Sequence, residues 1–75
     1  MSMKNPNEIR ITTRDRLLRA WENSMELVRD FQHYANLAED DPAASQMFAD
    51  FAEDEGRHAA AFREILQQYQ ARGEM

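Results

Sequence analysis

The chain has 75 residues, 31% of them charged, with nine basic and fourteen acidic side chains and a net charge of −5. This length allows one small domain at most, near the size at which a single hydrophobic core is marginal. The absence of cysteine excludes disulfides, zinc ribbons and thiolate iron sites, and the acidic balance argues against a nucleic-acid partner. Because no apolar run approaches the roughly 18 residues of a membrane span and no signal peptide opens the chain, we expect a cytoplasmic protein that does not enter a membrane.

The first part of the chain predicts an arm followed by a long helix. Residues 1–12 show no sustained periodicity, and we expect them to form a flexible N-terminal arm. Thr13 is suited to cap a first helix over residues 14–39, and Asp15 is favourable in its first turn. The apolar positions of this helix cover an arc of roughly 200°, which is wider than one neighbouring helix needs.

A second helix is predicted over residues 42–71. Asp41 followed by Pro42 is typical of an N-cap and first helical position, and Gly73 is typical of a helix end. The short link predicts an antiparallel hairpin over residues 13–72, followed by a C-terminal tail over residues 73–75. A lone pair of helices cannot bury seams this broad, so the fold class we expect is all-α, with two hairpins dimerising into a four-helix bundle.

The middle of the second helix carries two polar residues in an apolar stripe. Large apolar side chains recur there at steps of three and four residues: Phe48, Phe51, Phe62, Ile65 and Tyr69. The same stripe holds Glu55 and His58. An unpaired carboxylate and imidazole would be costly in apolar surroundings. A Glu-x-x-His pair in a helical bundle is a known metal motif.

Two interpretations of this pair stay open. Glu55 and His58 bind a metal ion, for which iron, manganese and zinc all suit the ligand types. Alternatively, they form a polar network across a two-fold axis, in which each Glu55 pairs with a His58 or with Arg29 of a neighbour. Beside the pair, Gly56 costs helix stability, and we expect a neighbouring backbone to approach it closely.

Residues 47–66 resemble the second helix of the rubrerythrin branch of ferritin-like proteins, with its E-x-x-H-A segment at residues 55–59. Residues 13–21 are similar to the opening of that family's first helix. One helix pair resembles the single-hairpin members, including encapsulated ferritins, which complete the bundle by association. The resemblance implies a non-haem di-iron site, with Glu55 as bridging carboxylate and His58 as terminal ligand, and a ferroxidase or peroxidase activity in iron oxidation, iron storage or peroxide reduction. Electrons or an encapsulating shell would come from other proteins, since the four cysteines of a rubredoxin-like module are absent.

The first helix departs from the family pattern. Aligned without gaps, the ligand glutamate of the family's first helix falls on Ser24, and a tyrosine two turns later falls on Phe31. Glu26 points almost opposite the apolar centre and Glu22 lies at its boundary, so whether either acid ligates is left open. The competing hypothesis is therefore a non-catalytic helical assembly or regulatory module that has lost the di-iron site.

Overall fold

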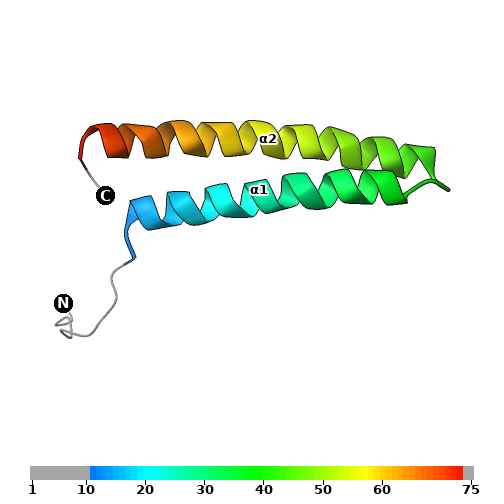
Figure 1. The fold of residues 1–75 in the computed structure, drawn as a ribbon, viewed down its shortest axis with the longest axis horizontal. Helices are drawn as coiled ribbons and strands as arrows, with labels where there is room; N and C mark the ends of the chain where they lie inside the picture. The colour runs from blue at the N-terminus through cyan, green and yellow to red at the C-terminus, as the bar shows by residue number, and fades with distance from the viewer. Residues whose placement is uncertain (1–10, 74–75) are drawn as a thin grey trace.

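The computed structural model describes residues 11–73, and these form two helices, α1 (Thr13–Leu37) and α2 (Pro42–Ala71). The helices lie side by side and antiparallel, with the turn at one end and the outer helix ends together at the other (Figure 1). The expected all-α hairpin is therefore confirmed. The expected arm over residues 1–12 and tail over residues 73–75 fall mainly outside the described part of the chain.

The first turn of α1 is held by a reciprocal capping box. The backbone N–H of Asp15 donates to the Thr12 hydroxyl oxygen at 3.1 Å, and the Thr12 N–H donates to Asp15 Oδ2 at 3.0 Å. The backbone hydrogen bond from Thr12, followed by the side-chain one, lowers the pKa of Asp15 below its ordinary value. The cap is thus Thr12 rather than Thr13, because the acidic partner of a capping box lies three residues after the cap.

The turn between the helices is fixed by side chains. Asp41 caps α2 by accepting from the Ala44 N–H at 3.1 Å, and Pro42 occupies the start of the helix, as expected. The Ser45 hydroxyl donates to the Ala35 carbonyl at 2.7 Å, which ties the start of α2 to the end of α1. At the far end, Gly73 takes the left-handed conformation, with φ of 76°, that glycine adopts without strain.

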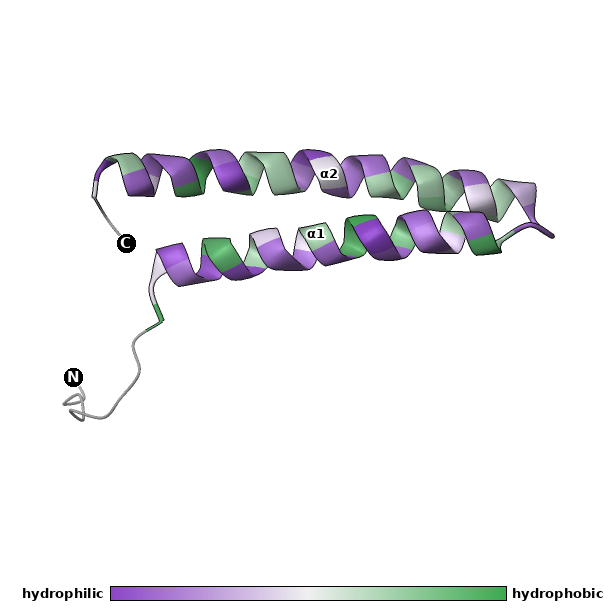
Figure 2. Cartoon of the chain, viewed as in Figure 1, coloured by the Kyte–Doolittle hydropathy of each residue, from purple (hydrophilic) through white to green (hydrophobic). Residues whose placement is uncertain are grey.

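The two helices pack against each other over small side chains. The buried residues of the described chain are Ser24 at 6% exposure, Ala52 at 5% and Ala59 at 3%. Across residues 11–73 no large side chain is fully buried, and apolar residues appear along the outer sides of both helices as well as between them (Figure 2). The hairpin by itself therefore has a thin core.

The apolar stripe expected on α2 is divided in the structure. Phe48, Phe62 and Tyr69 are half-buried, whereas Phe51 and Ile65 remain 46% and 41% exposed. The positions that face α1 follow a heptad-like spacing, and Phe51 and Ile65 belong to the neighbouring stripe. One stripe thus packs within the hairpin, and the other lies on its outer surface.

Candidate functional site

Glu55 and His58 lie near the middle of α2, one helical turn apart. His58 Nδ1 is 3.4 Å from Glu55 Oε1, so the two side chains form an ion pair when the imidazole is protonated. The Glu55 side chain is 21% exposed and the His58 side chain is 60% exposed. The structure therefore brings the predicted pair together, with Glu55 beside the packed seam. The expectation that both side chains lie in apolar surroundings is wrong for His58 within the hairpin, because it is directed toward the outer surface.

The surface next to this pair is built from aromatic and aliphatic side chains of both helices. The ring of Phe31 lies 6.0 Å from Phe48 and 6.2 Å from Phe51, and Tyr34 lies 5.5 Å from Phe48. Flanking these rings are apolar side chains that stay substantially exposed in the single chain. We call the whole surface the aromatic face: Leu27, Phe31, Tyr34, Phe48, Phe51 and Ile65.

Phe31 and Ser24 take structural positions in this hairpin. Phe31, where the rubrerythrin-like pattern has a tyrosine, is the ring shared by two of the aromatic contacts. Ser24, where that pattern has a ligand glutamate, is the one buried residue of α1. Its core-side position agrees with the sequence, and its small side chain suits a seam that also contains Ala52 and Ala59.

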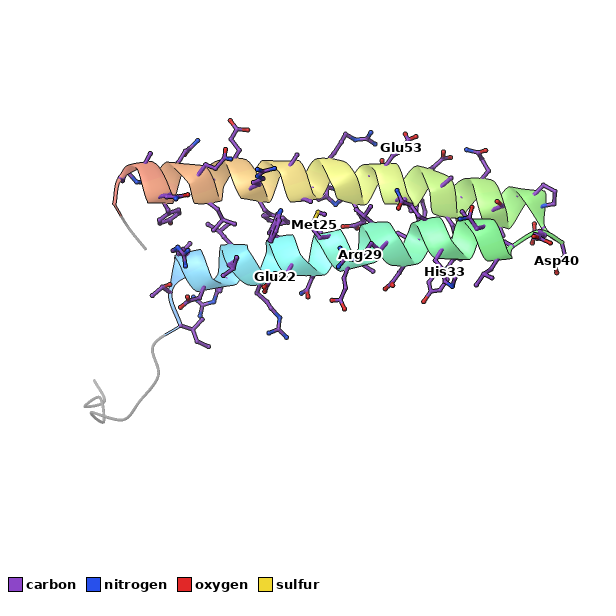
Figure 3. The ribbon with its side chains drawn as sticks, viewed as in Figure 1. Glu22, Met25, Arg29, His33, Asp40 and Glu53 are labelled. Carbon is purple, nitrogen blue, oxygen red and sulfur yellow. The ribbon has the colours of Figure 1, made fainter. Side chains whose placement is uncertain are left out.

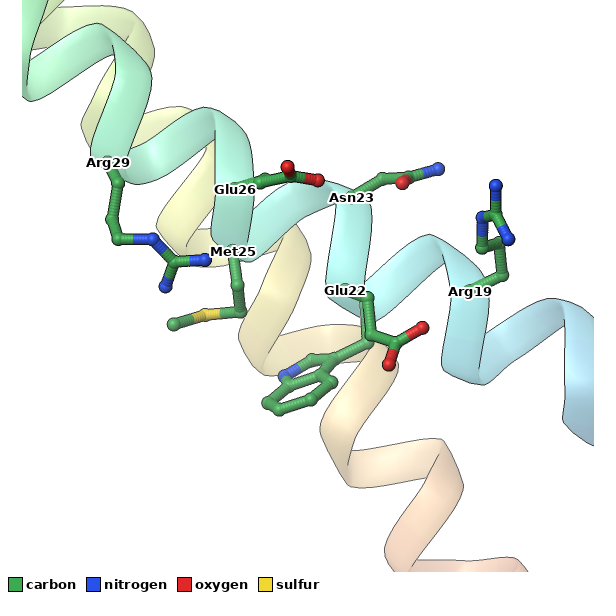
Figure 4. Close-up of a pocket in the computed structure, with 7 residues that line it drawn as sticks. Arg19, Glu22, Asn23, Met25, Glu26 and Arg29 are labelled. Carbon is green, nitrogen blue, oxygen red and sulfur yellow. The ribbon is translucent and has the colours of Figure 1, made fainter.

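The two acids of α1 that could replace the missing glutamate lie on the helix exterior. Glu22 and Glu26 are exposed and line a shallow hollow of about 470 Å³ on α1, together with Arg19 and Arg29 (Figure 4). The two acids lie between the two arginines along the helix, and all four side chains are exposed. This is the arrangement of a solvated charged surface.

The edge of the hairpin opposite the aromatic face contains two cavities. Two cavities of about 470 and 220 Å³ lie between α1 and α2, and Gly56 lines both. A Cβ built at Gly56 would meet nothing within 4 Å. The expected close approach of a neighbouring backbone is therefore wrong within the described chain. We call this edge the Gly56 face: Trp21, Met25, Val28, Gln32, Ala49, Gly56 and Ala60.

The candidate pair supplies two potential metal ligands within the described part of the chain. Among residues 11–73, no three histidine, aspartate or glutamate side chains come together as such a site requires. Glu55 and His58 supply one carboxylate and one imidazole. A second copy of the pair would raise the donor set to two of each, which is within the range that iron, manganese and zinc accept. Glu55 and His58 therefore fit a metal ion when further donors join them.

Other polar residues near the hairpin surface show no such convergence. His33 and Glu53 lie on opposite outer sides of the hairpin and are exposed (Figure 3). Arg57 pairs with Asp54 one turn away on α2. These residues are useful as controls because they have the chemistry of the candidate site without its surroundings.

Comparison of the chain with family models, with curated proteins and with solved structures gives no match. Neither of the described helices combines the length and the apolar character that crossing a membrane requires.

Proposed function

We propose that this chain is a ferritin-like, rubrerythrin-related metal-binding protein. Two hairpins associate through their aromatic faces into a four-helix bundle, and Glu55 and His58 of both chains hold iron between the subunits. The activity we propose is iron oxidation and storage or peroxide reduction. The observation that carries this proposal is the Glu55–His58 pair, which adjoins an apolar surface that the single chain leaves open.

The exposed apolar side chains support the association step. Tyr34 is 43% exposed, Phe51 46% and Ile65 41%. Tyr34 and Phe51 belong to the ring cluster with Phe31 and Phe48, and Ile65 lies two turns beyond His58 on α2. A cluster of exposed aromatic rings such as this one is typical of an interaction site. Covering it would also remove His58 from water, which makes a second charge or a cation beside the pair favourable.

The donor atoms support the metal step. The Glu55 carboxylate can hold one ion or bridge two, and the neutral imidazole of His58 can donate a nitrogen lone pair. Iron held by Glu55 and His58 would supply one-electron chemistry with oxygen or peroxide. The protein's own contribution is to fix these ligands on a helix and to exclude bulk water with the surrounding aromatic rings.

A second candidate function is a non-catalytic assembly module with the same bundle. Two observations favour it: Ser24 is buried where a ligand glutamate would be needed, and Phe31 is packed among aromatic rings. Under this hypothesis the Glu55–His58 pairs form a polar network across the subunit interface and hold no ion.

Metal loading of matched variants separates the two candidates. Protein loaded with Fe(II) without oxygen and then desalted is analysed for metal by mass spectrometry, as wild type and as Glu55→Gln and His58→Ala. The controls are Glu53→Gln and His33→Ala, which remove the same groups from exposed positions. We expect wild type and both controls to retain iron, and both site variants to lose at least about ten-fold in affinity. Equally low iron in all five proteins, with association intact, would leave the assembly module as the function.

A further inference from the structure

A further hollow lies between α1 and α2 near the outer helix ends, away from the turn (Figure 1). It has a volume of about 260 Å³ and is lined by residues of α1 between positions 14 and 21 and by residues of α2 between positions 63 and 70. The lining residues recur at steps of three and four, so they belong to one side of each helix. We call this feature the open-end hollow.

The walls of the open-end hollow contain apolar side chains from both helices. Leu18 and Trp21 of α1 and Leu66 of α2 line it, and all three are half-buried. Apolar walls with a few polar groups are the usual composition of small-molecule sites, and the volume is slightly below the range of about 300–1,000 Å³ that such sites occupy. The hollow is therefore suited to a small ligand that has an apolar body.

The charged groups that line the hollow are two arginines, one from each helix. Arg14 is half-buried and Arg63 is exposed. Within residues 11–73 the guanidinium group of neither forms a salt bridge or a hydrogen bond. No acid lines the hollow, and Asp15, which follows Arg14 in the chain, is held in the capping box by Thr12. The two positive charges are thus available to an anionic ligand.

The antiparallel packing of the helices places the two arginines at different ends of the hollow. Arg14 and Trp21 are seven residues apart on α1, and Arg63 and Gln70 are seven residues apart on α2, which is about 10 Å along each helix at 1.5 Å per residue. Because the helices run in opposite directions, Arg14 lies at the end that contains Gln70, and Arg63 lies at the end that contains Trp21. The apolar walls therefore lie between two separated cationic groups.

The charge of the surrounding half of the hairpin favours the approach of an anion. Residues 13–25 and 57–72 carry six arginines and three acids, for a net charge of +3. A positive potential of this kind raises the local concentration of anions and their rate of association. The shallow hollow on the exterior of α1 differs, because two acids and two arginines line it together.

We propose that the open-end hollow binds a small molecule with two carboxylate groups joined by a hydrocarbon body. One carboxylate accepts hydrogen bonds from Arg14 and the other from Arg63, since a guanidinium group offers parallel N–H donors that match a carboxylate. The hydrocarbon body covers the apolar walls between them. Gln67 and Gln70 add side-chain amides that can donate to the carboxylate at their end of the hollow.

The single tryptophan of the chain provides the readout, because Trp21 lines the hollow and its indole N–H gives one signal in a heteronuclear NMR spectrum. Metal-free, full-length protein is titrated with suberate, a straight-chain dicarboxylate, at constant pH and ionic strength. We expect a saturable shift of the indole signal at concentrations below about 10 mM. The monomethyl ester of suberate keeps the chain and loses one charge, and it should bind at least about three-fold more weakly.

Matched arginine variants locate the ligand. Arg14→Gln and Arg63→Gln should each weaken suberate binding at least about three-fold, and the double variant at least about ten-fold. The controls are Arg19→Gln and Arg57→Gln, which remove the same charge from exposed positions on the same two helices outside the hollow. We expect both controls to bind suberate as the wild type does, and circular dichroism verifies that every variant is helical.

Four results would overturn the proposal: no saturable shift, equal affinity for the monomethyl ester, equal weakening in the control variants, or an equal response to sulfate at the same ionic strength. The proposal is independent of the metal-binding function, because Glu55→Gln and His58→Ala change no residue that lines the hollow. Both variants should bind suberate as the wild type does, so failure of one proposal leaves the other standing.

Discussion

The two outer edges of the hairpin differ in shape, although the same two helices build both. The aromatic face projects rings and aliphatic side chains from Leu27 to Ile65, beside Glu55 and His58. The Gly56 face is hollow, with open space where a side chain at Gly56 would lie. Projecting apolar surface gains free energy when a partner covers it. The large apolar side chains of the Gly56 face, Trp21, Met25 and Val28, are already half-buried within the hairpin and leave less apolar surface to cover. The candidate site thus lies on the edge at which we propose that association occurs.

The largest expected effect comes from making the aromatic face polar. A triple variant, Leu27→Gln, Phe51→Gln and Ile65→Gln, keeps good helix formers and adds no charge near Glu55. We expect the dimer to weaken by at least about 100-fold, because central apolar residues carry most of the energy of an interface. Sedimentation equilibrium measures the change, and circular dichroism verifies that the hairpin is still helical.

The matched control for that variant is Ala60→Gln, which adds a polar side chain to the Gly56 face. We expect association to be unchanged. If Ala60→Gln dissociates the dimer as strongly as the triple variant does, the contrast between the two edges is wrong and the Gly56 face is the covered one.

The packed seam should be sensitive in a different way. Ala59→Leu introduces three carbon atoms at a position with 3% exposure, and overpacking of this kind costs about 1–3 kcal/mol of folding free energy. Denaturant unfolding measures it, with Ala61→Leu on the exposed surface of the same helix as the control. A cost no greater than that of the control would show that the helices do not pack closely at this level.

Gly56→Ala is expected to raise the free energy of unfolding slightly, whereas Ala59→Leu lowers it. Because a Cβ at this position meets nothing within 4 Å, alanine should stabilise the protein by about 1 kcal/mol through helix propensity alone. Thermal unfolding at fixed protein concentration measures this. A loss of stability that grows as the protein is diluted would instead reveal a partner backbone close to Gly56.

The smallest effect is expected far from both faces, at the start of α1. Thr12→Ala removes one side of the capping box and should cost about 1 kcal/mol. Because the pKa of Asp15 is lowered by its bonds to Thr12, the carboxylate stabilises the fold above its ordinary pKa, and this contribution is lost as the pH falls through the lowered value. Asp15→Asn should therefore flatten the acid limb of the stability profile. An unchanged acid limb would exclude the capping box as its source.

Much of the hairpin could be predicted from local sequence signals. Asp41-Pro42 and Gly73 define α2 because N-cap chemistry and the left-handed conformation depend on single residues. The predicted cap of α1, Thr13, lies one residue after the observed cap, Thr12. Both threonines are suitable caps, and the hydrogen bond between the Thr12 N–H and the Asp15 carboxylate decides between them. The end of α1 at Leu37, two residues before the expected one, reflects the non-helical backbone of Ala38.

The candidate site was predictable in part. Spacing alone brings Glu55 and His58 to one side of a helix, and the structure places them together. Spacing could not show that His58 lies outside the α1–α2 seam. Residues three apart on a helix, such as Phe48 and Phe51 or Glu55 and His58, differ by only about 60° around the helix axis. A stripe of that width can face α1, a partner chain or both, and which neighbour covers which side is a tertiary property.

The most direct test of the proposed shared site compares iron binding by the wild-type protein with that by the triple glutamine variant, which keeps Glu55 and His58 intact. We expect the wild type to retain iron after desalting and the variant to lose it together with the proposed dimer, because the described part of one chain brings only Glu55 and His58 together. Equal iron retention by a monomeric variant would contradict it, because the site would then be complete within one hairpin.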